Sequence, residues 1–168
     1  EFGTLEQLQV TPITRSELII GKIVPFVLIG FVQLTILVVM MEWLFGVHTQ
    51  GSMAALYVLS GLYIAAVLGL GILISTVAGT QMQATNLSMM LVMPFVFLSG
   101  YVFPIGGMPT IFQWLTTLVP ANYAIQILRG IVLRGATVAD LAEPIFWLSA
   151  YTVGIIGLAV FRFKKTAA

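Results

Sequence analysis

The feature that most constrains this chain is a run of 86 residues, 43–128, that contains no Asp, Glu, Lys or Arg. The whole 168-residue chain is 60% hydrophobic and 8% charged, whereas soluble domains average about 25% charged residues. A soluble fold of this size could not bury so much apolar surface, which argues against a soluble enzyme. One membrane helix needs about 20 apolar residues, so the run must hold at least two spans and a turn. The sequence therefore predicts a multi-pass membrane protein.

Continuous apolar segments of helical length predict an all-α membrane protein with four transmembrane helices. The segments lack the alternating pattern of membrane strands, and at about 1.5 Å rise per residue each can cross a hydrocarbon core of roughly 30 Å. The expected spans are 23–45, 53–78, 84–103 and 144–161.

Basic residues predict how these spans are oriented. Four spans place both ends of the chain on one side of the membrane. Five basic residues lie near the ends and two lie on the opposite side, namely Arg15, Lys22, Arg162, Lys164 and Lys165 against Arg129 and Arg134. The positive-inside rule therefore places the lead-in 1–22 and the tail 162–168 in the cytoplasm.

The first residues carry no signal peptide pattern. Glu1 is not followed by a basic segment and an apolar core. We therefore expect the chain to be the C-terminal part of a longer protein of the plasma membrane, the inner membrane in bacteria.

The connection 104–143 is unlike an ordinary polar loop. It contains two largely apolar segments, 110–119 and 121–133, that are too short to span and are separated by Pro120. Short apolar helices of this kind are typically re-entrant or interfacial. A lid packed on the spans and a direct functional role are equally compatible with the pattern.

The lead-in 1–22 contains two capping-box patterns, at 4–7 and 14–17. The first predicts a short helix that exposes Leu5 and Leu8 and breaks before Pro12. The second predicts a helix that continues into the first span. The short helix is either an ordinary juxtamembrane helix or a docking element for a cytoplasmic partner.

Motifs for catalysis or cofactor binding are absent from the sequence. There is one histidine, His48, no cysteine, and no phosphate-binding loop of the GxxxxGK[ST] type. No basic patch with interleaved aromatics supports nucleic-acid binding. An enzyme and a cofactor within this chain are therefore not expected, and transport or scaffolding remains.

Three segments carry a family resemblance. The lead-in matches at Glu1, Gly3, Thr4, Glu6, Leu8, Thr11, Pro12, Glu17, Gly21 and Lys22, and the turn 75–84 matches at Gln81, Gln83 and Ala84. Segment 98–135 matches at Ser99, Gly100, Phe103, Pro104, Met108, Pro109, Pro120, Tyr123, Arg129, Gly130 and Gly135. Together they resemble the membrane (permease) subunit of type-2 ABC transporters, the exporter-type superfamily.

The resemblance implies that the four spans are helices three to six of a six-helix permease. The lead-in would be the coupling helix, which seats in a groove of the ATP-binding cassette subunit. Its site residues would be Gly3, Thr4, Leu5, Glu6, Leu8, Pro12 and Glu17, and Gln81 and Gln83 would form a second cytoplasmic turn.

The connection 104–143 would be the family's external re-entrant pair, near the exit of the pathway. The residues of this region are Pro104, Met108, Pro109, Trp114, Pro120, Tyr123 and Arg129. The sequence departs from the family at 105–107, where Ile-Gly-Gly replaces residues that are often polar or charged.

The leading hypothesis is a permease subunit of an ATP-driven ABC exporter for a hydrophobic or amphipathic substrate, such as a drug, lipid or glycan. The permease would pair with a second permease copy, identical or not, and ATP and Mg would bind the partner ATP-binding subunit. Asn86, Ser88, Met93 and Phe97 are candidate pathway-lining residues. The alternatives are an ATP-independent channel or secondary transporter and a non-transporting membrane scaffold.

Overall fold

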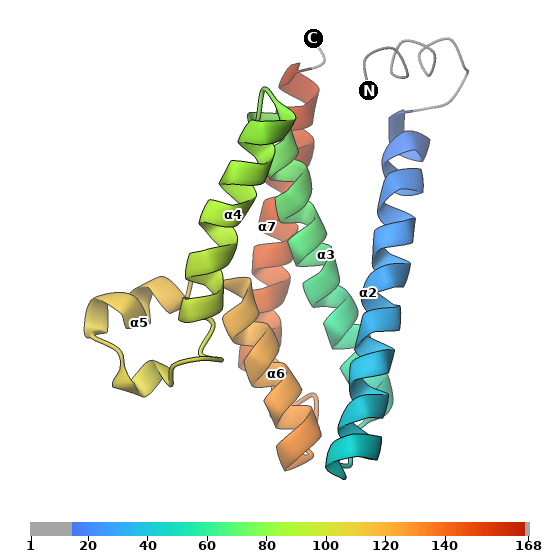
Figure 1. Cartoon of the computed structure of the whole chain (residues 1–168), viewed down its shortest axis with the longest axis vertical. Helices are drawn as coiled ribbons and strands as arrows, with labels where there is room; N and C mark the ends of the chain where they lie inside the picture. Colours follow the sequence, from blue (N-terminus) through green and yellow to red (C-terminus); the bar gives the residue numbers. More distant parts are fainter. Residues whose placement is uncertain (1–14, 167–168) are drawn as a thin grey trace.

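A computed structural model describes residues 15–166, which form helices and no strand (Figure 1). The elements are α2 (Arg15–Phe45), α3 (Met53–Val77), α4 (Gln81–Leu98), the 3-10 turn η1 (Ile105–Gly107), α5 (Thr110–Thr116), α6 (Pro120–Arg134) and α7 (Ala142–Thr166). The all-α prediction is confirmed.

Three helices are long and apolar enough to cross a membrane, judged by length and composition. They are Ile23–Phe45, Met53–Val77 and Ala142–Phe161, and they correspond to the first, second and fourth expected spans. Helix α4 is not among them, because its polar opening sequence QMQATN lowers the mean hydropathy of its 18 residues. The expected count of four spans therefore stays a prediction.

The helices define two ends of the bundle. Helix α2 begins and α7 ends at one end, which we call the tail end, and the loop 46–52 lies at the opposite, loop end (Figure 1). Helix α4 starts at the tail end and stops part of the way along the bundle, whereas α6 continues to the loop end (Figure 1).

Helix α4 ends at Leu98, before the expected end at residue 103, because the next residues turn the chain. The Ser99 hydroxyl donates to the carbonyl of Val96 at 2.7 Å and accepts from the Tyr101 N–H at 3.3 Å. Gly100 follows with a φ of +78°, which few other residues adopt. The apolar pattern continues past this turn, so hydropathy alone does not reveal it.

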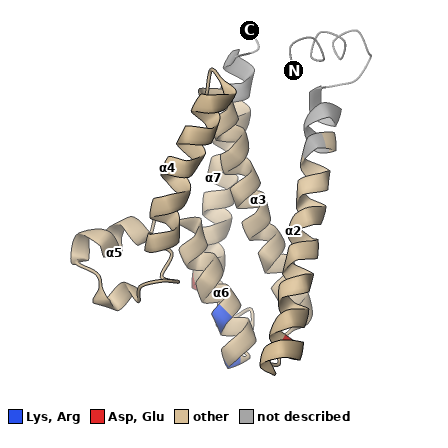
Figure 2. Cartoon of the chain, viewed as in Figure 1, with Lys and Arg blue, Asp and Glu red and all other residues tan. Residues whose placement is uncertain are grey.

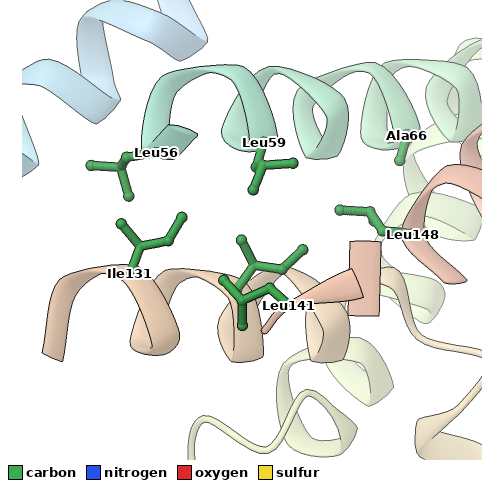
Figure 3. Packing of buried hydrophobic residues seen from close by; sticks show 7 residues of the cluster. Leu56, Leu59, Ala66, Ile131, Leu141 and Leu148 are labelled. Atoms are coloured by element: carbon green, nitrogen blue, oxygen red, sulfur yellow. The ribbon is translucent and has the colours of Figure 1, made fainter. Parts of the chain in front are cut away.

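The core lies between α3, α6 and α7 (Figure 3). Its buried apolar residues are Leu56, Leu59, Ala66, Ile127, Ile131, Leu141 and Leu148. Gly69 is also buried on α3, and a Cβ there would lie 3.1 Å from the side chains of Ile155 and Ile156. The absence of a side chain at Gly69 therefore lets α3 and α7 approach closely.

Helix α2 is peripheral, and its main contact within the described bundle is with α3. The Phe31 and Tyr57 rings stack with centroids 6.3 Å apart, and the Tyr57 hydroxyl lies 2.9 Å from the Thr35 hydroxyl. A Cβ at Gly61 would lie 3.0 Å from the Phe31 ring. One side of α2 therefore packs on α3, and many side chains on its other sides are exposed.

At the loop end, the loop 46–52 packs on the last turns of α6. The Gln50 N–H donates to the carbonyl of Val132 at 3.1 Å. A Cβ at Gly51 would lie 2.8 Å from the backbone oxygen of Ile131, so this contact requires glycine. Helix α6 then ends at Gly135, whose φ of +61° is the left-handed cap that glycine favours.

Candidate functional site

The expected coupling segment falls at the edge of the described structure. Gly3, Thr4, Leu5, Glu6, Leu8 and Pro12 lie outside the described residues, and Glu17 lies in the first turns of α2, where side chains are not described. Helix α2 itself runs from Arg15 to Phe45 and contains Pro25, which has no N–H to donate to the carbonyl four residues before it.

The turn before α4 is held by a reciprocal pair of side-chain hydrogen bonds. The Thr80 hydroxyl accepts from the Gln83 N–H at 3.2 Å, and the Gln83 side-chain oxygen accepts from the Gly79 N–H at 2.9 Å. This arrangement resembles a capping box, and the spacing Thr-x-x-Gln in the sequence could have predicted it. Gln83 thus has a structural role at this turn, although its side chain is exposed like that of the neighbouring Gln81.

Helix α4 presents a largely exposed face and contributes no fully buried residue. Asn86, Met93 and Phe97 follow one another at intervals that place them on the same side of a helix. All three side chains are exposed, with Met93 and Phe97 at 66% and 50%. The structure therefore brings three of the four expected pathway residues onto one face.

Ser88 differs from the other three expected pathway residues. At 100° per residue it lies about 200° around the helix from Asn86. Its side chain is half-buried, and its hydroxyl donates to the carbonyl of Ala84 at 2.8 Å. The hydroxyl of Ser88 is therefore already satisfied within α4.

Two shallow hollows lie along this helix. One, of about 330 Å³, is lined by Thr80, Met82, Gln83, Asn86, Leu87 and Met90. The second, of about 300 Å³, lies where α4 meets η1 and α5 and is lined by Pro94, Phe97, Leu98, Phe103, Met108 and Phe112. The first hollow offers amide and hydroxyl groups beside apolar side chains, and the second is apolar throughout.

The connection after α4 contains the two expected helices, now seen as α5 and α6. Helix α6 packs on α3 and α7, whereas α5 projects to the side of the bundle (Figure 1). Trp114 and Ile111 on α5 are 72% and 74% exposed. The lid interpretation therefore fits α6 and not α5, which offers apolar side chains outward.

The corner between α5 and α6 is fixed by side chains that bond to the backbone. The Tyr123 hydroxyl donates to the carbonyl of Thr117 at 2.8 Å, and the buried Asn122 amide donates to the carbonyl of Thr116 at 3.2 Å. Gln126 donates to the Asn122 side-chain oxygen at 2.9 Å. Pro120 is buried at the first position of α6, where its fixed φ suits a helix start. Tyr123 and Pro120 thus shape the corner.

The other expected residues of this region lie at its turns. Pro104 precedes η1, and Pro109 precedes α5. The carbonyl of Met108 accepts from the Gln113 side chain at 2.8 Å. Arg129 is exposed on α6.

Charged side chains that the structure describes belong to segments toward the loop end (Figure 2). They are Glu42, Arg129, Arg134, Asp140 and Glu143. The Asp140 carboxylate accepts from the Thr137 hydroxyl at 2.7 Å and from the Thr137 N–H at 2.9 Å. These two hydrogen bonds, the hydroxyl first, lower the pKa of Asp140 below its ordinary value. Among residues 15–166, no group of three or more His, Cys, Asp or Glu forms a metal-binding cluster.

The fold defines a multi-pass α-helical membrane protein. One face of its helix α4 has polar residues near the start of the helix and apolar residues near its end. Residues 1–133 match the model of the ABC-2 type transporter family, and the chain therefore belongs to that family. The family is one of membrane permeases rather than of enzymes.

Relatives with curated names agree with this assignment. The chain is 32% identical over 166 residues to the "Probable multidrug ABC transporter permease YbhS" of Escherichia coli (strain K12), covering 98% of this chain and 44% of that protein. It is 35% identical over 167 residues to the "Probable multidrug ABC transporter permease YbhR" of the same strain, covering 98% of this chain and 45% of that protein.

A third relative comes from a different bacterium. The chain is 30% identical over 139 residues to the "Linearmycin resistance permease protein LnrN" of Bacillus subtilis (strain 168), covering 83% of this chain and 36% of that protein. The chain thus spans less than half the length of these three relatives. No solved structure gives a significant match.

Proposed function

We propose that the chain is part of a permease that exports hydrophobic or amphipathic molecules, driven by ATP bound to a partner subunit. The observation that carries this proposal is the family match over residues 1–133, joined by relatives named for multidrug permeases and linearmycin resistance. ATP and Mg would bind the ATP-binding cassette subunit. A second permease copy, identical or related, would complete the membrane part.

The pathway in this proposal follows the exposed face of α4. Asn86 contributes an amide near one hollow, and Phe97 contributes a ring to the apolar hollow near α5. The polar part of an amphipathic molecule would bind near the Asn86 amide, and its apolar part would bind near the Phe97 ring. The same face would lie opposite the second permease copy, so that the two copies enclose the substrate.

The energy source in this proposal enters through the lead-in 1–22. Residues 43–128 carry no formal charge, so proton or ion coupling within that stretch has few groups to use. A coupling helix at 4–10 would contact the ATP-binding subunit and shift α2, which begins at Arg15 and contains Pro25. Such a shift requires contacts that differ between the ATP-bound and ATP-free states.

The proposed location is the bacterial inner membrane, with both ends of this chain in the cytoplasm. The tail end of the bundle, where α2 begins and α7 ends, would face inward (Figure 1). The bias of basic residues toward the two ends supports this orientation.

Coupling can be tested with Glu6→Ala and Leu8→Ala in the full-length permease with its ATP-binding partner. If residues 4–10 dock on that partner, each variant should lower substrate-stimulated ATP hydrolysis and export together, by about tenfold for a lost interface contact near 1.4 kcal/mol. Gln9→Ala, outside the matched positions, is the control. Normal ATP hydrolysis and export in both variants, at normal expression, would overturn the docking role.

A further inference from the structure

One polar side chain in the apolar part of α2 lacks a partner. Gln33 forms no hydrogen bond to any of the described residues, and its side chain is exposed. It lies near the middle of the segment Ile23–Phe45, about 15 Å from either end at 1.5 Å per residue. A glutamine amide has two donors and one acceptor, and hydrocarbon offers a partner to none of them. In contact with lipid, the amide of Gln33 would therefore be left without a hydrogen-bond partner.

The neighbouring Thr35 shows how the same helix satisfies a polar group when it can. The Thr35 hydroxyl donates to the carbonyl of Phe31 at 2.8 Å and lies 2.9 Å from the Tyr57 hydroxyl. Thr35 thus bonds within α2 and to α3. Gln33 has no such arrangement, although it is only two positions away.

The side of α2 that carries Gln33 is distinct from the side that meets α3. Gln33 lies one turn from Ile29 and Leu37, which are 53% and 65% exposed. The residues that face α3 include Phe31 and Val38. Ile29, Gln33 and Leu37 therefore form an apolar stripe with one amide at its centre, which we call the Gln33 stripe. Polar residues in such stripes typically mark contacts between membrane helices.

We propose that the Gln33 stripe packs against a further transmembrane helix of the same permease polypeptide, outside these 168 residues, and that this helix offers a polar side chain to the Gln33 amide. The chain spans 44% and 45% of the two multidrug relatives, so a permease of their size has ample sequence for such a helix. The choice of this occupant rests on the proposed function, which places the second permease copy against α4.

The arrangement of the bundle favours this occupant over a second copy. Helices α2 and α4 lie on opposite sides of α3 (Figure 1). The hollows lie along α4, which is the face proposed for the second permease copy. The Gln33 stripe is on the other side and remains available to the same polypeptide.

The first test compares Gln33→Leu with Val32→Leu in the full-length permease in lipid nanodiscs. Val32 lies at the same depth on a different side of α2 and is 58% exposed. Gln33→Leu should lower the midpoint of thermal unfolding by a few degrees, because the partner of the amide is left unpaired. Val32→Leu should leave the midpoint unchanged. A lipid-facing glutamine would give an equal or higher midpoint on replacement by leucine, and that result would overturn the proposal.

The second test identifies the occupant without depending on a destabilised variant. A photoreactive diazirine amino acid is placed at position 33 of the full-length permease, and the adducts are analysed by gel electrophoresis and mass spectrometry. The proposal predicts an adduct of monomer mass that joins position 33 to a peptide outside residues 1–168. An adduct of dimer mass, an adduct to lipid, or no adduct at all would overturn it.

Discussion

At the scale of single residues, three glycines decide how the loop end is assembled. Gly51 lies against the backbone of Ile131, Gly130 lies against the side chain of Leu141, and Gly135 ends α6 in the left-handed conformation. A Cβ at Gly130 would lie 2.7 Å from Leu141, a flexible side chain, whereas the atom facing Gly51 is a carbonyl oxygen. The contact at Gly51 is therefore the least able to adjust.

Replacing Gly51 by alanine should destabilise the protein by about 1–3 kcal/mol, the usual cost of an overpacked contact. The added Cβ would lie 2.8 Å from the Ile131 oxygen and force the loop away from α6. Thermal unfolding of the full-length protein measures the change. Gly71→Ala is the control, since nothing lies within 4 Å of its Cβ and alanine favours a helix. Equal stability of the two variants would refute the close contact.

The Asp140 carboxylate links stability to pH. Its pKa is lower in the folded chain than in the unfolded chain, so the folded state binds a proton less readily. The stabilisation is therefore present above the ordinary carboxyl pKa of about 3.9 and is lost as the pH falls through the lowered value.

Thr137→Val removes the hydroxyl whose hydrogen bond lowers the pKa of Asp140 the most. The variant should therefore raise this pKa toward its ordinary value. The variant should be less stable than the parent at about pH 7, and the difference should shrink toward about pH 3. Unfolding midpoints of the full-length protein across this range measure it. Thr137→Ser keeps the hydroxyl and should behave as the parent does. A difference that is constant with pH would show that Asp140 is not involved.

At the scale of elements, hydropathy predicts the long helices and fails at short turns. The expected segment 53–78 corresponds to α3 within one residue, because a charge-free apolar run leaves the backbone no alternative to a helix in lipid. The expected segment 84–103 does not end where α4 ends. Its boundary depends on Ser99 and Gly100, whose effect is a local turn and not a change in hydropathy.

In the candidate site, too, some features could be predicted from the sequence and others could not. Spacing alone groups Asn86, Met93 and Phe97 on one face and separates Ser88, which a helical projection of the sequence could have shown. The hollow near α5 could not have been predicted, because it depends on how Phe103 and Phe112 return toward α4 after the Gly100 turn. Gln33 was also missed, because the sequence does not show that the described helices leave its amide without a hydrogen bond.

The proposed pathway on α4 predicts which substitutions change substrate preference. Asn86→Ala and Phe97→Ala should alter the KM for transported compounds by about fivefold or more, as expected for contacts of about 1 kcal/mol. Ser88→Ala should have little effect on KM, because its hydroxyl is bonded to the Ala84 carbonyl. Transport assays with several amphipathic substrates measure these values. A larger effect of Ser88→Ala than of the other two would place the pathway on a different face.

At the scale of the whole molecule, the described helices form one packed unit and one peripheral helix. Helices α3, α6 and α7 share the buried core, whereas α2 contacts α3 through Phe31, Thr35 and Tyr57 and also packs on the core at Val38. We propose that α2 carries a displacement from the cytoplasm to the membrane.

We propose that the full-length permease moves its substrate at the expense of ATP. This can be measured as uptake of a fluorescent amphipathic compound into inside-out proteoliposomes that contain the full-length permease and its ATP-binding partner. ATP-driven export predicts uptake that requires both the partner and hydrolysable ATP, and that persists when proton and sodium gradients are collapsed. Equal uptake without ATP, or uptake driven by an ion gradient alone, would contradict it.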